Sequence, residues 1–161
     1  MENSVCESSC TSGLYADPST NLCSASCTNS RYGDPTTNTC VETCPVNYFR
    51  DPSGYCKNAC SPLRADNVSL TCTSKCSEGL WGHNNECVSI CPDTTYGYEP
   101  DRDCYTVANR PNSNYFAEND TNTWVTVCPY EPLTYGNRQT KYCVSVCEDA
   151  SLYADPLTRE C

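Results

Sequence analysis

The sequence predicts a small, disulfide-rich, mostly β or irregular fold: an elongated rod of tandem β-hairpin repeats of about 16 to 20 residues each. Three observations lead to this prediction. The chain of 161 residues contains 17 cysteines, a share typical of disulfide scaffolds. Leu, Ile, Val and Phe together make up only about 13% of the chain, too little for a conventional apolar core. The cysteines recur at regular spacing, so covalent links are expected to replace that core.

Pairs of cysteines separated by three residues mark the repeats. The C-x3-C pairs are Cys6/Cys10, Cys23/Cys27, Cys40/Cys44, Cys56/Cys60, Cys72/Cys76, Cys87/Cys91 and Cys143/Cys147. Self-similarity at a fixed period indicates a single repeat array, here predicted for residues 6–161 after a tail of residues 1–5. Its units start near Cys6, Cys23, Cys40, Cys56, Cys72, Cys87, Cys104, Trp124 and Cys143.

Aromatic and polar residues recur at fixed distances from the cysteines. An aromatic residue stands about eight positions before the next first cysteine, at Tyr15, Tyr32, Phe49, Trp81, Tyr96, Phe116, Tyr135 and Tyr153. Two positions later comes a small polar residue, at Asp17, Asp34, Asp51, Glu118, Asn137 and Asp155. Pro follows Asp in four units, which suits a type I turn. Each unit is therefore predicted as a strand carrying the aromatic residue, a turn, and a second strand such as 125–127 or 144–146.

One irregular unit favours a particular disulfide pairing. Ala108 stands where a second cysteine is expected, and Trp124 stands where the next first cysteine is expected. If each second cysteine bonds the next first cysteine, both losses belong to one missing bond and only Cys6 is left unpaired or intermolecular. The predicted bonds are Cys10–Cys23, Cys27–Cys40, Cys44–Cys56, Cys60–Cys72, Cys76–Cys87, Cys91–Cys104, Cys128–Cys143 and Cys147–Cys161.

Two other pairings are possible in principle. Bonds within each C-x3-C pair would leave Cys104, Cys128 and Cys161 without partners. Interlocked bonds, joining first cysteines to first and second to second, would also leave unpaired cysteines around the irregular unit. The sequential ladder is therefore favoured over both.

Charge and cysteine content restrict the compartment and the partners. The formal net charge is −10, and no basic cluster suitable for nucleic acid is visible. A cysteine density of this kind persists in oxidising compartments, so we expect a secreted protein, extracellular or at the cell surface. The first residues do not resemble a signal peptide, and no stretch is apolar enough for a transmembrane segment. The chain is accordingly expected to be a processed form or a piece of a longer protein.

The repeat unit resembles a known family. The segment from Cys40 to Cys56, with Cys44-Pro45, Tyr48-Phe49 and Asp51-Pro52, is similar to furin-like, growth-factor-receptor cysteine-rich repeats. It looks closest to the version found in surface proteins of ciliates and related protists. The resemblance covers essentially the whole chain, and it implies an extracellular, rod-like, non-catalytic module of surface coats, antigens and receptor stalks.

The residue types argue against several chemistries. The cysteine spacing differs from the usual zinc spacing, and His83 is the single histidine. A repeat offers a single acidic residue at this place, followed by Pro in four units, which fits a turn cap better than a calcium loop. No catalytic constellation stands out, so we expect neither an enzyme nor a cofactor. The aromatic series is interpreted as rings covering disulfides, with a carbohydrate-binding stripe as the alternative.

Two kinds of further site are predicted. The sequons Asn67-Val68-Ser69 and Asn119-Asp120-Thr121 are expected to carry N-glycans at Asn67 and Asn119. The cysteine-free stretch 109–123 is expected to act as a hinge, unless Trp124 packs on Ala108 in place of the lost bond. A third alternative is that Trp124 is exposed and forms an interface with a neighbour.

The leading functional prediction is an extracellular structural protein that assembles with copies of itself, head to tail, into a fibre, surface coat or stalk. The end carrying Cys161 is expected to meet the end carrying Cys6. The alternative is a ligand-binding or adhesive ectodomain fragment of a cell-surface receptor or antigen.

Overall fold

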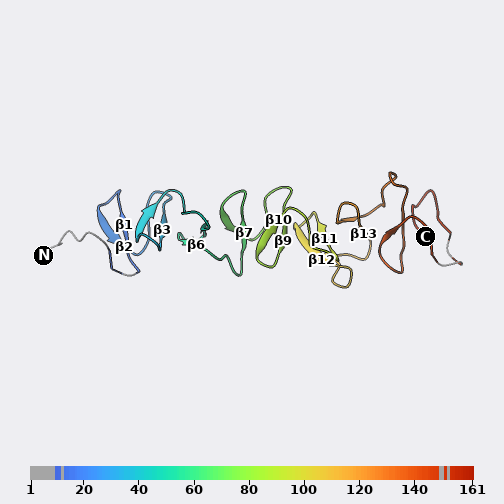
Figure 1. The fold of residues 1–161 in the computed structure, drawn as a ribbon, viewed down its shortest axis with the longest axis horizontal. Coiled ribbons are helices and arrows are strands. Elements are labelled where there is room, and N and C mark those ends of the chain that lie inside the picture. Colours follow the sequence, from blue (N-terminus) through green and yellow to red (C-terminus); the bar gives the residue numbers. More distant parts are fainter. Residues whose placement is uncertain (1–9, 12, 149–150, 152) are drawn as a thin grey trace. The chain divides into compact units, whose positions relative to one another are not determined.

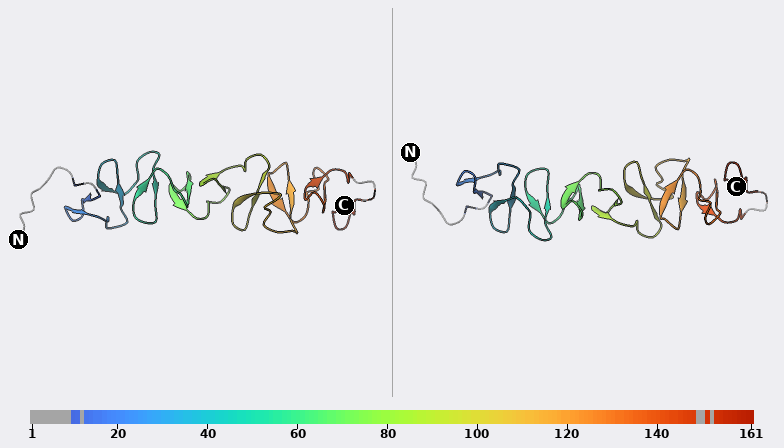
Figure 2. Two further views of the ribbon diagram at one scale, coloured as in Figure 1. Left: turned by 90° about the horizontal axis from the view of Figure 1, so that it is seen from below. Right: turned by 90° about the horizontal axis from the view of Figure 1, so that it is seen from above.

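The computed structural model describes residues 10–11, 13–148, 151 and 153–161, and the chain divides into two units, residues 1–74 and 75–161. All regular elements of the described residues are strands of two to four residues, and none of these residues lies in a helix (Figure 1). The colours in Figure 2 show that, within each unit, the hairpins follow one another in sequence order. The predicted helix-free array of small hairpins is confirmed.

The first unit contains four antiparallel hairpins. Its strands are β1 (Tyr15–Asp17), β2 (Leu22–Ser24), β3 (Tyr32–Asp34), β4 (Thr39–Val41), β5 (Phe49–Arg50), β6 (Cys56–Lys57), β7 (Arg64–Asp66) and β8 (Thr71–Thr73). The first strand of a hairpin pairs in parallel with the second strand of the next hairpin. The spatial orders that result are β2-β1-β4-β3 and β7-β8-β5-β6. A parallel bridge between Gly33 and Tyr55 continues this pattern between the two groups.

The second unit repeats the same scheme. Its strands are β9 (Trp81–His83), β10 (Glu86–Val88), β11 (Thr95–Tyr98), β12 (Asp103–Thr106), β13 (Phe116–Glu118), β14 (Thr123–Val125), β15 (Tyr135–Gly136) and β16 (Cys143–Val144). The strands from β9 to β14 follow the order β13-β14-β11-β12-β9-β10 within one sheet, and β15 pairs with β16. Isolated parallel bridges join Ala117 to Tyr142 and Gly136 to Glu160.

The disulfides follow the predicted pairing order. All eight bonds of the ladder form, with Cα–Cα distances of 5.2 to 5.7 Å, which is ordinary disulfide geometry. Most of the buried apolar side chains are these half-cystines, joined by a few alanine and aromatic side chains. The small core therefore runs along the disulfides, as the low aliphatic content requires.

Two local predictions need correction. The strands expected at 125–127 and 144–146 end at Val125 and Val144, because the chain bends directly afterwards, and Val127 and Val146 are exposed. The stretch 109–123 is not a bare loop, since β13 lies within it and β14 begins at its end. Phe116 and Glu118 supply the ring and the turn carboxylate of an ordinary repeat, so the chain forms a hairpin there.

Candidate functional site

The candidate site is the contact between successive hairpins, because the structure builds it from the same parts at most steps. The first part is the turn that joins the two strands of a hairpin. In the turn after β3, the Thr36 N–H donates to Oδ1 of Asp34 at 2.8 Å, and the Thr37 hydroxyl donates to Oδ2 at 2.8 Å. A backbone N–H two residues on is likewise bound by Asp17, Asp51, Asp66, Glu118, Asn137 and Asp155. The predicted turn-capping role is confirmed.

Burial gives these turn carboxylates their electrostatic character. Asp17 and Asp34 are almost fully buried, at 1% and 2% exposure. The Thr28 hydroxyl and N–H and the Ser19 N–H lower the pKa of Asp17 to about 2, although burial raises it. Burial also raises the pKa of Asp34, but its hydrogen bonds outweigh this effect and the pKa is lowered. The turns therefore contain carboxylates that stay ionised while buried.

The second part is a backbone hydrogen bond from one hairpin to the next. The residue after the aromatic position donates its N–H to the carbonyl of the last turn residue in the following hairpin. The pairs are Ala16–Asn38, Gly33–Gly54, Arg50–Leu70, Gly82–Arg102, Gly97–Asn122, Ala117–Lys141 and Gly136–Arg159, with N–O distances of 2.6 to 2.9 Å. Every accepting residue has a positive φ, from 51° to 91°, which ends the turn and begins the second strand.

The third part is an aromatic ring resting on the following hairpin. A Cβ added at Gly33 would lie 2.7 Å from the Tyr15 ring, and one added at Gly97 would lie 2.5 Å from the Trp81 ring. Phe116 contacts Gly136 in the same way. Phe49 packs with Ala65 and Tyr96 with Ala117, so alanine is tolerated at some steps. The ring needs a small residue opposite because it lies directly on the strand.

Sequence reasoning missed two features of this contact. A small residue directly follows most of the aromatic positions in the sequence, as in Tyr15-Ala16 and Tyr96-Gly97. The sequence alone does not show that such a residue contacts the aromatic ring of the preceding hairpin. Asp66 was also missed, because Arg64 occupies the aromatic position of its repeat. The spacing of two residues between Arg64 and Asp66 is the signal that identifies this turn.

The rings also cover disulfides, as predicted. Phe49 packs against Cys60 and Cys72, and Phe116 packs against Cys128 and Cys143. Tyr153, in contrast, is 84% exposed.

At the irregular unit, an aromatic cluster replaces the missing disulfide. Trp124 is only 5% exposed and packs with Ala117 and Tyr96, whose ring centroid lies 5.6 Å from that of Trp124. Tyr142 contacts the same Tyr96 edge to face, with a centroid distance of 6.0 Å. Burial and the contact with Tyr142 raise the pKa of Tyr96 to about 12. The prediction of an exposed Trp124 at an interface is wrong, because the ring fills the space beside Tyr96, whereas Ala108 is exposed.

The predicted glycosylation sites lie at equivalent turn tips. Asn67 and Asn119 each follow the turn carboxylate, at the position that Pro occupies in four other repeats, and both side chains are exposed. Asn119 Oδ1 accepts a hydrogen bond from the Tyr96 hydroxyl at 2.7 Å. This bond engages the oxygen of the amide and not the nitrogen to which a glycan is attached. Cys6 lies outside the described residues.

The described residues contain no group of three or more His, Cys, Asp and Glu side chains arranged to hold a metal ion. They also contain no helix of the length and apolarity needed to cross a membrane. Eight disulfides favour a protein that matures in an oxidising, secretory environment.

Comparison with known proteins adds no relative. No family model matches the chain, and neither a curated protein nor a solved structure matches it.

Proposed function

We propose that this protein is an extracellular structural component that assembles with copies of itself, head to tail, into a fibre, surface coat or stalk. The observation that carries the proposal is the polarity of the contact between hairpins. Most hairpins place a ring and an N–H on the next hairpin, and they offer a small residue and a turn carbonyl to the hairpin before them. Such a heterologous contact can continue from one chain to another without closing.

The first and last described hairpins leave these surfaces open. Tyr153 and Ala154 are exposed, and no described residue accepts the Ala154 N–H. In the first hairpin, no described residue donates to the Asn21 carbonyl, which is equivalent to the accepting carbonyl of Asn38. In the proposed assembly, Tyr153 of one copy rests on Ala16 of the next, and the Ala154 N–H donates to the Asn21 carbonyl.

Cysteine pairing limits how the copies are joined. Cys161 is bonded to Cys147, so the proposed contact is non-covalent at that end. Cys6 takes no part in the eight bonds, and an additional intermolecular link through it is part of the proposal. An extracellular location and glycans at Asn67 and Asn119 are part of the proposal, supported by the disulfides, the exposed turn tips and the resemblance to furin-like repeats.

Sedimentation analysis over a range of concentrations tests the assembly. We expect wild-type protein to form oligomers that grow with concentration and appear as filaments in negative stain. Tyr153→Ala should shift the distribution towards monomer, because it removes the proposed ring contact. Val46→Ala, which shortens a side chain that is 88% exposed elsewhere, should leave assembly unchanged. Wild-type protein that is monomeric at every concentration would contradict the proposal and favour the ectodomain alternative.

A further inference from the structure

One step of the array departs from the rule that a small residue receives the preceding ring. At the step from β3 to β5, the residue facing Tyr32 is Arg50, whose guanidinium carbon lies 6.0 Å from the ring centroid. This distance is at the outer limit of cation–π contacts. Arg50 keeps the backbone bond of the repeat, since its N–H donates to the Leu70 carbonyl at 2.9 Å. The backbone hydrogen bond between the hairpins is therefore intact here. The Tyr32 ring, however, does not pack directly on a strand in the way that the preceding rings pack on Gly33 and Gly97.

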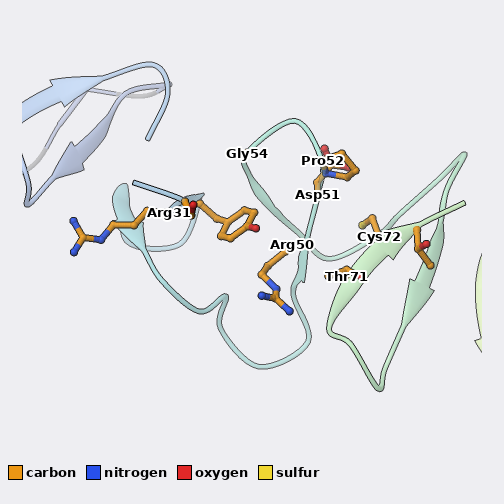
Figure 3. Close-up of a pocket in the computed structure, with 10 residues that line it drawn as sticks. Arg31, Arg50, Asp51, Pro52, Gly54, Thr71 and Cys72 are labelled. Carbon is orange, nitrogen blue, oxygen red and sulfur yellow. The ribbon is translucent and has the colours of Figure 1, made fainter. Parts of the chain in front are cut away.

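A pocket of about 430 Å³ opens at this step, where Tyr32 has no small residue opposite its ring. Tyr32 and Arg50 line it together with hydroxyl-bearing side chains of Ser30, Thr71 and Thr73. Figure 3 shows the lining residues, with Arg50 and Thr71 on the paired strands β5 and β8 and Pro52 with Gly54 at the turn between β5 and β6. Tyr32 and Arg50 are half-buried, so both are partly accessible to a ligand. The volume suits one or two sugar rings better than a large ligand.

The charges around the pocket leave one cation without a counter-ion. Arg50 donates to the Ser69 carbonyl at 2.6 Å, and no described carboxylate lies within ion-pairing distance of it. The nearby Asp51 is already paired with Lys57 at 2.9 Å. Arg31 is paired with Glu42, and its guanidinium points away from Arg50 in Figure 3. A half-buried arginine with unused donors is suited to a carboxylate, which it can bind with two parallel hydrogen bonds.

We propose that this pocket binds a carboxylate-bearing sugar residue, such as a uronic acid of a surface glycan. The carboxylate binds the free donors of Arg50, the C–H face of the sugar packs on Tyr32, and the sugar hydroxyls bond Ser30, Thr71 and Thr73. The chain's net charge of −10 disfavours long, dense polyanions, because they are repelled by the rest of the surface. A short saccharide with a single carboxylate places it at Arg50 and avoids that repulsion.

An NMR titration with galacturonic acid tests the proposal, with its neutral methyl ester as the control ligand. At concentrations where the protein is monomeric, the acid should cause saturable shifts at the backbone amides of Tyr32, Arg50 and Thr71. The methyl ester should cause none. Arg50→Gly should weaken binding about tenfold or more and keep the fold, because it introduces the residue that equivalent positions use. Arg110→Gly, which removes an exposed arginine elsewhere, should bind like the wild type.

Arg50→Gln removes the charge but keeps a polar side chain, and it serves if Arg50→Gly fails to fold. It should show the same loss. Three outcomes would overturn the proposal: no saturable shift with the acid, equal binding of the methyl ester, or wild-type affinity in a folded Arg50 variant. Because the titration uses monomer, these outcomes are independent of self-assembly.

Discussion

At the scale of single residues, acidic side chains occupy buried positions that aliphatic side chains fill in a larger protein. Asp17, Asp34 and Asp66 are among the most buried side chains, yet each is satisfied by backbone N–H groups and hydroxyls of its own turn or of the next repeat. A buried carboxylate is tolerated when hydrogen bonds replace its hydration. Asn137 shows that the acceptor oxygen, and not the charge, is what the turn requires.

This distinction predicts how stability responds to acid. The pKa of Asp17 is about 2 in the folded chain against an ordinary value of 3.8, so the unfolded chain binds more protons between these values. The contribution of Asp17 to the free energy of unfolding is therefore complete above about pH 5 and is lost as the pH falls through about 2. Asp17→Asn should keep the turn but reduce the loss of stability between pH 5 and pH 2.

Denaturant unfolding of the oxidised protein at both pH values measures this effect. Asp93→Asn, which changes an exposed carboxylate outside the hairpin turns, should lose as much stability on acidification as the wild type. The other buried carboxylates preserve part of the acid response in Asp17→Asn. An acid response in Asp17→Asn equal to that of the wild type would contradict the prediction.

At the scale of the hairpin, shape complementarity between a ring and a strand sets the position of one repeat on the next. The Trp81 ring lies against Gly97 so closely that a Cβ at this position would be 2.5 Å from the ring. Gly97→Ala should destabilise the second unit by about 1 to 3 kcal/mol, because overpacking forces the ring or the strand to move. In a Trp81→Ala background the same substitution should cost much less.

Unfolding of the two single variants and the double variant completes a double-mutant cycle. A cost of Gly97→Ala that is the same with and without the Trp81 ring would show that the ring does not rest on this strand. The backbone of Gly97 does not confuse the comparison, because its φ is not in the left-handed region that favours glycine.

Trp124 shows that an aromatic contact can substitute for a disulfide between hairpins. A bond closing a loop of this length is worth about 3 kcal/mol in the chain-entropy model, and burying a tryptophan contributes a similar amount, about 3 to 5 kcal/mol. The repeat therefore tolerates the paired loss of two cysteines at Ala108 and Trp124. It does so by burying the Trp124 ring against Tyr96 and Ala117.

The sequence predicts these hairpins well where local chemistry determines them. The spacing of the cysteines and the Asp-Pro turns, such as Asp34-Pro35, predicts the number of hairpins, their order and their disulfides. The sequence did not predict that aromatic rings of the preceding hairpins pack on Gly33 and Gly97, because these contacts depend on how one hairpin lies on another. The same limit explains Trp124, whose burial depends on the Tyr96 ring from the preceding hairpin and not on its own position in the repeat.

At the scale of the whole chain, the contacts that hold the array together are local. Within each unit, successive hairpins bond to one another, and each disulfide closes a loop with a sequence separation of 11 to 15 residues. Stability in such arrays is close to a sum of terms for single repeats and their nearest-neighbour interfaces. With so little aliphatic core, most of that sum comes from the disulfides, so full reduction should unfold the chain.

Removing a single bridge separates local from global stability. Cys44→Ser with Cys56→Ser opens a loop with a separation of 12 residues and should cost about 3 kcal/mol. Because hairpin β5–β6 contacts hairpins β1–β2, β3–β4 and β7–β8, amide hydrogen exchange should become faster there and in the contacting strands β1, β3 and β8. Amides of the second unit, such as those of β11 and β14, should keep their protection.

Removing Cys147 and Cys161 instead should reverse this pattern, with faster exchange near β15 and β16 and unchanged exchange in the first unit. Loss of protection along the whole chain after removal of either bridge would mean that the array unfolds as one cooperative body. Full protection in strong reductant would mean that the disulfides are not what keeps it folded. Local loss in both variants is expected, because the hydrogen bonds and ring contacts of the described residues join hairpins that are adjacent or only one hairpin apart in the chain.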